Sequence, residues 1–88
     1  MIKIQNILSD DVFGLWHVKK IVVKKDRQRF ILTLDDERFA TKDDAEHHAR
    51  VRAQRFLQRK PGLANGNIFW NVATAYERML LSYLLARR

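Results

Sequence analysis

The sequence predicts an α+β fold in which two helices pack on a small three-stranded antiparallel sheet, in the order β-β-β-α-α. β-Branched and aromatic residues are concentrated in the first 41 positions, as is typical of strands. An alanine-faced helical pattern follows at residues 42–60, and an apolar stretch at residues 67–87 predicts a second helix. Glycine and proline cluster between them, in a predicted turn at 61–66. With 88 residues, 47% of them apolar, the chain is expected to form a single domain over 1–88.

The strand region contains two hydrophobic runs joined by a polar turn. Residues 13–24, FGLWHVKKIVVK, are rich in β-branched and aromatic types, and the segment KDRQ that follows has a turn composition that includes Asp26. In the next run, RFILTL, successive side chains point to opposite faces of a predicted strand, and Arg29, Ile31 and Thr33 lie on the outer face. Its predicted core-facing residues are Phe30, Leu32 and Leu34.

Two shorter strands are predicted at the borders of this region. The segment DDE forms a second turn, and RFA at residues 38–40 is predicted to be the third strand of the meander, with Phe39 in the core. At the N-terminus, isoleucines alternate with polar residues over 2–8, which allows for an extra strand.

The first predicted helix has clear start and stop signals. Thr41 is a suitable N-cap, acidic residues fill the first turn, and Pro61–Gly62 ends the helix. At 100° per residue, one face is apolar and small enough to lie close against a sheet. The residues predicted on that face are Ala45, Ala49, Ala53 and Phe56, with Leu57 at its edge.

The charge of the chain points to a polyanionic partner. The formal net charge is +7, an excess that attracts nucleic acid, anionic membranes or acidic proteins. The chain has no cysteine, which excludes disulfides and thiolate metal sites and fits a reducing compartment. Its first residues lack the apolar run of a signal peptide, so a cytoplasmic location is expected.

Basic residues are concentrated in two segments. On the first helix, a stripe spaced i, i+4, i+7 and i+11 contains His48, Arg52, Arg55 and Arg59. The hairpin segment KKIVVKKDRQR, residues 19–29, holds six lysines or arginines against the single Asp26. Six of the ten acidic residues fall between 35 and 46, so the molecule is expected to have a basic and an acidic end. Basic residues late in a helix also complement the helix dipole without any ligand, so the stripe alone leaves both readings open.

The predicted function is non-enzymatic nucleic-acid binding through backbone phosphates, of DNA or RNA. The candidate contact residues are Lys24, Lys25, Arg27, Arg29, Arg52, Arg55 and Arg59. A sheet backed by one helix resembles, in outline alone, the DNA-reading domains of plant ethylene-response factors and of phage integrase arms, although their tryptophan-rich strand motifs are missing. The alternative is an interaction module, such as an adaptor or inhibitor from a phage or mobile element, that docks an acidic protein.

No arrangement of residues predicts catalysis, a cofactor or a metal. His47 and His48 are adjacent and point about 100° apart on a helix, so they cannot share one metal ion. The carboxylates at 35–37 and 43–44 are explained by a turn and a helix cap rather than by a nuclease site. For Phe13, Trp16 and Phe30, near the basic hairpin, core packing is expected rather than base stacking.

The predicted C-terminal helix is apolar on nearly every side. Opposite its core face lies a second stripe, predicted to contain Trp70, Leu81 and Leu85. Charged residues near the middle of the segment make membrane insertion costly, so a membrane partner is not expected. The stripe therefore predicts a homodimer interface, and the alternative is that the N-terminal segment of the same chain covers it.

Overall fold

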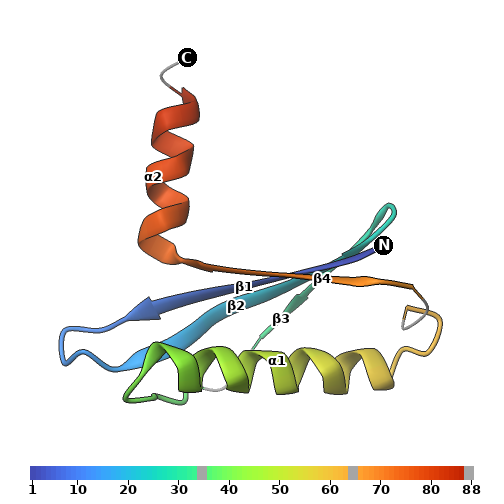
Figure 1. Ribbon diagram of the computed structural model, residues 1–88, viewed down its shortest axis with the longest axis horizontal. Coiled ribbons are helices and arrows are strands. Elements are labelled where there is room, and N and C mark those ends of the chain that lie inside the picture. The colour runs from blue at the N-terminus through green and yellow to red at the C-terminus, as the bar shows by residue number, and fades with distance from the viewer. Residues whose placement is uncertain (34–35, 64–65, 87–88) are drawn as a thin grey trace.

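The computed structural model describes residues 1–33, 36–63 and 66–86, and shows an α+β fold with a four-stranded mixed sheet and two helices (Figure 1). The elements are β1 (Ile2–Asp10), β2 (Trp16–Lys25), β3 (Gln28–Leu32), α1 (Lys42–Gln58), β4 (Ile68–Thr74) and α2 (Ala75–Ala86). The strands lie in the order β3-β2-β1-β4. β1 pairs antiparallel with β2 and parallel with β4, and β2 pairs antiparallel with β3.

The N-terminal strand, predicted as an optional addition, is an interior strand of the sheet. β1 has paired neighbours on both sides, and Ile2, Ile4 and Leu8 are buried at no more than 1% exposure. The predicted strand at 38–40 is not a strand, because Phe39 makes only an isolated bridge with Trp16. The three-stranded antiparallel meander is therefore β1-β2-β3. A tight turn, in which Asp26 has a φ of +54°, joins β2 to β3. Leu34 lies outside the described residues.

Helix α1 packs across one face of the sheet, as its alanine pattern predicts. Ala45, Ala49 and Ala53 are each 0% exposed, and at the N-cap the Asp44 N–H donates to Thr41 Oγ1 over 3.1 Å. Near the C-terminal end the prediction is corrected in one detail. Leu57 is the buried residue at 4% exposure, whereas Phe56 is half-buried and packs against Phe30 with ring centroids 5.4 Å apart.

The predicted helix over 67–87 is wrong in its first half, because Ile68–Thr74 form strand β4. The segment IFWNVAT is rich in aromatic and β-branched residues, which favour an extended chain. The segment has apolar side chains on both faces, as is typical of a strand that pairs in parallel. It pairs in this way with β1. The observed order is therefore β-β-β-α-β-α.

Helix α2 projects away from the sheet, on the side opposite to α1 (Figure 1). None of its residues is buried. It is also short: within the described residues, neither helix has the length and apolar character needed to cross a membrane.

The sheet has one covered face and one open face, and side-chain alternation assigns residues to each. Ile2, Ile4 and Leu8 belong to the core that packs beneath α1. Lys3, Gln5 and Ile7 therefore point to the other side, because successive side chains of a strand alternate. We call this side the open face; of the two helices only α2 stands on it, above one end (Figure 1).

Candidate nucleic-acid interface

Three basic residues lie side by side on the open face, one from each of three neighbouring strands. In the register of the sheet, Lys3 is opposite Lys24, and Lys24 is opposite Arg29. All three side chains are exposed, and none forms an ion pair with an acid in the described ranges. We call this set the cationic row. Like charges placed directly across a sheet repel one another, so the row costs stability unless an anion binds to it.

An exposed aromatic ring and two amides extend the cationic row across the open face. Phe69 of β4 is opposite Lys3 in the parallel ladder and is 54% exposed. One step further along the strands, Asn71 is opposite Gln5. These side chains, with Lys24 and Val22, line a shallow depression of about 180 Å³. Cations, a ring and hydrogen-bonding amides thus lie together on one surface.

The predicted arginine stripe lies on a different surface, at the outer edge of β3. Arg52, Arg55 and Arg59 line a depression of about 220 Å³. Its other lining residues are Leu32, Thr33 and Phe56. His48, predicted to continue the stripe, lies instead beside Glu37, with Nε2 3.6 Å from the carboxylate Oε2.

The predicted hairpin cluster is divided between the two faces of the sheet. Lys24 and Arg29 belong to the cationic row, whereas the Lys25 ammonium donates to the Gly62 carbonyl over 3.0 Å, beside the end of α1. Arg27 is exposed in the turn between the strands. Arg59 lies near this hairpin, because it also lines a depression with Gln28 of β3. The basic residues of hairpin, β1 and helix end therefore gather at one end of the molecule.

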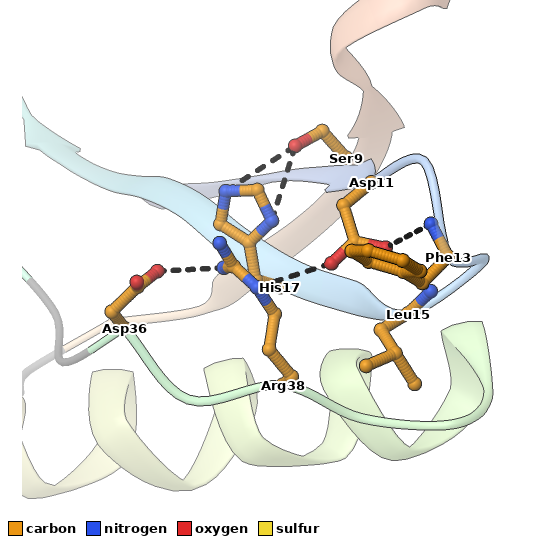
Figure 2. A network of polar contacts seen from close by, with 7 residues as sticks. All are labelled: Ser9, Asp11, Phe13, Leu15, His17, Asp36 and Arg38. Atoms are coloured by element: carbon orange, nitrogen blue, oxygen red, sulfur yellow. Dashed lines mark hydrogen bonds and ion pairs between the residues drawn. The ribbon is translucent and has the colours of Figure 1, made fainter.

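The opposite end of the sheet is tied together by a network that includes two acidic residues (Figure 2). Asp11 Oδ1 accepts hydrogen bonds from the N–H groups of Phe13 and Leu15, at 2.9 and 3.0 Å. Arg38 reaches both Asp11 and Asp36, with N–O distances of 3.4 and 2.6 Å. Asp11 thus lies at the end of the sheet opposite to the hairpin of β2 and β3, because the register pairs Asp10 with Trp16 and Ile2 with Lys25. Asp35 lies outside the described residues.

Among the residues that the structure describes, neither the histidines nor the carboxylates converge on a metal-binding geometry. The part of the chain that the structure describes contains no group of three or more histidine, aspartate or glutamate residues able to hold a metal ion. His17 lies beside Ser9, whose Oγ is 3.3 Å from the ring Nδ1 (Figure 2). His48 stacks near Phe39, with ring centroids 5.0 Å apart. These positions give both histidines structural neighbours.

The aromatic residues and the predicted dimer stripe need correction. Trp16 and Phe30 pack against the core as expected, but Phe13 is 83% exposed in the loop after β1. Trp70 does not share a helical stripe with Leu81 and Leu85, because it lies in β4. There its ring packs against the core on the α1 side, 5.2 Å from the Arg50 guanidinium carbon.

Sequence reasoning missed Lys3 and Phe69. The alternation that predicts a strand at 2–8 also places Lys3 opposite to the isoleucines, so its exposure could have been read from that pattern. Phe69 could not be placed on this face while its segment was assigned to a helix. Comparisons of the chain with protein-family models, with curated proteins and with solved structures find no match.

Proposed function

We propose that the protein binds nucleic acid on the open face of its sheet, with phosphates on the cationic row. The observation that carries this proposal is the register of Lys3, Lys24 and Arg29 across three strands. A bound phosphate chain relieves the repulsion within the row, and release of its condensed counterions adds to the affinity. The surface requires no catalytic group, so the proposed role is non-enzymatic.

The chemistry beside the cationic row favours a single strand over a duplex. An exposed aromatic ring next to cations is a stacking platform for unpaired bases, and Phe69 has this position next to Lys3. Gln5 and Asn71 add amides that both donate and accept hydrogen bonds to base edges. Bases of a duplex are stacked on one another and cannot reach the ring in this way.

The arginines at the β3 edge form the proposed continuation of the path. Arg29 and Arg59 lie on the two sides of one five-residue edge strand, and Arg55 lies further along the same edge. A flexible strand that leaves the open face at β3 can reach these guanidinium groups, which suit phosphate oxygens. With roughly five to seven phosphates of a single strand neutralised along this path, at about 0.7 for each contact, the expected slope of log affinity against log salt is about −3.5 to −5.

The experiment is a titration of labelled random single-stranded DNA, single-stranded RNA and duplex DNA at several salt concentrations. Lys24→Gln is expected to weaken single-strand binding and to make the salt slope shallower by about 0.7, the contribution of one phosphate contact. Lys42→Gln is the matched control, since it removes the same charge at the start of α1, away from the open face. The control is expected to bind as the unmodified chain does.

The outcomes separate this proposal from its rival. Equal losses in Lys24→Gln and Lys42→Gln would mean that net charge alone attracts the polyanion, and would overturn the site. Absence of binding to all three nucleic acids at about 50 mM salt would overturn the function. That result would favour the second candidate, an acidic protein docked on the same basic end.

A further inference from the structure

Helix α2 has an apolar stripe on the side that faces away from the open face. At 100° per residue, its side chains divide into two sets on opposite sides. One set lines the groove beside the sheet with Gln5 and Asn71, and contains Glu77, Arg78, Leu81, Ser82 and Leu85. The other set, which we call the outer stripe, contains Tyr76, Met79, Leu80, Tyr83 and Leu84.

The outer stripe has the spacing of a helix that packs against another helix. Its positions follow i, i+3, i+4, i+7 and i+8, the repeat of a core-facing surface. Each side chain is nevertheless 44–66% exposed. A helix of 12 residues is marginal in water without tertiary packing. The stripe therefore leaves about half of its apolar surface open to solvent, on a helix that would gain stability from covering it.

We propose that the outer stripe is the dimer interface of the protein, and that its occupant is the outer stripe of a second copy. If each half-exposed side chain contributes about 100 Å², the stripe offers on the order of 500 Å² per protomer. A pair then buries about 1,000 Å² in total, the lower limit for a specific interface, so a weak dimer is expected. The inference does not depend on nucleic-acid binding, because the cationic row lies on another surface.

The two helices are antiparallel in this dimer. Each protomer has a net charge of +7, and a parallel pair would hold both charged bodies at the same end of the helix pair. An antiparallel pair separates them by the length of α2. With the twofold axis near Leu80, Tyr76 of one protomer lies beside Leu84 of its partner.

Two neighbouring leucines provide a matched test by light scattering over a concentration series. Leu80→Glu places a charge in the outer stripe and is expected to weaken dimerisation by at least about tenfold. Leu81→Glu places the same charge on the groove side, where Leu81 is 59% exposed, and is expected to leave the dimer intact. A monomer mass for the unmodified chain up to millimolar concentration would overturn the proposal. So would a dimer that Leu81→Glu dissociates and Leu80→Glu does not.

Disulfide trapping tests the pairing without a charge in the helix. The chain has no cysteine, so single-cysteine variants report one contact each. Leu80→Cys is expected to form a covalent dimer, because residues near the axis come within disulfide reach. Tyr76→Cys should cross-link only when mixed with Leu84→Cys. Cross-linking of Tyr76→Cys with itself would indicate a parallel pair and overturn the antiparallel arrangement. If none of the three single-cysteine variants formed a covalent dimer, alone or mixed, the interface itself would be overturned.

Discussion

Thr74 and Glu77 hydrogen-bond reciprocally at the junction of β4 and α2. The Glu77 N–H donates to Thr74 Oγ1 over 3.0 Å, and the Thr74 N–H donates to Glu77 Oε2 over 3.1 Å. This capping box satisfies two amides that the first turn of a helix leaves without partners. It also explains why the chain turns from strand to helix at this point, with no loop between the two elements.

Thr74→Ala is therefore expected to destabilise α2 by about 0.5–2 kcal/mol. Since no residue of α2 is buried, the loss should appear as a lower helical signal in far-UV circular dichroism, with little change in the melting of the sheet. Glu77→Gln is the control, because glutamine also accepts the Thr74 N–H bond. An unchanged helical signal in Thr74→Ala would show that the cap does not limit the stability of α2.

Asn6 is a polar residue buried in an otherwise apolar position of β1. It is 0% exposed, and neither its side-chain oxygen nor its nitrogen has a hydrogen-bond partner among the described residues. Burial of such a group costs free energy, because it loses its hydrogen bonds to water and gains none within the protein. Asn6→Leu, a change of similar shape, is expected to raise the free energy of unfolding in urea by about 1–3 kcal/mol.

Gln5→Leu on the adjacent, half-exposed position serves as control and should change stability by less than about 0.5 kcal/mol. A lower stability for Asn6→Leu would mean that the amide is hydrogen-bonded in solution, for instance to a buried water.

Ala49 lies in the middle of the alanine face of α1, between Ala45 and Ala53, and is 0% exposed. Ala49→Leu adds three carbons where no space is left, and is expected to destabilise the protein by about 1–3 kcal/mol in thermal or urea unfolding. Gln54→Leu is the control, because Gln54 is exposed on the outer side of α1, and this substitution should leave the stability nearly unchanged. Equal effects at the two positions would contradict close packing of α1.

Phe69→Ala tests base stacking separately from charge. It is expected to weaken single-strand binding by about 1–3 kcal/mol and to leave duplex binding unchanged, because only unpaired bases can stack on the ring. Ile31→Ala is the control, since Ile31 is 55% exposed, and the register places it on the same face but without an aromatic ring. Equal losses in the two variants would indicate a general apolar contact rather than stacking.

The elements predicted from sequence are those specified by local signals. Thr41, the alanine repeat and Pro61 fix α1 within its own segment, and Asp26 marks the turn of the hairpin. Strand β4 was missed because its partner β1 lies more than sixty residues earlier, and a parallel pairing of distant segments leaves no local turn signature. The segment TAYE at residues 74–77 has the spacing of a capping box, a local signal for the true start of the last helix that the prediction of a helix from residue 67 did not take into account.

The candidate site shows the same division. Composition was enough to select Lys24 and Arg29 as candidates, because they lie in a basic hairpin. Composition could not predict that Lys3 lies beside them, because the position of Lys3 depends on which strand pairs with β2 and in what register. Nor could composition predict that Lys25 lies on a different face from Lys24 and Arg29, where its ammonium donates a hydrogen bond to the Gly62 carbonyl on the α1 side.

The pairing of β1 with β4 makes folding depend on contacts between distant parts of the chain. Until residues 68–74 are available, the β1-β2-β3 meander exposes the backbone of β1 along one side, next to buried isoleucines. An apolar edge of this kind readily recruits strands from other chains. The long loop that β4 must close slows folding. Aggregation during synthesis is thus a greater hazard for this protein than for one whose central strand pairs only with its sequence neighbours.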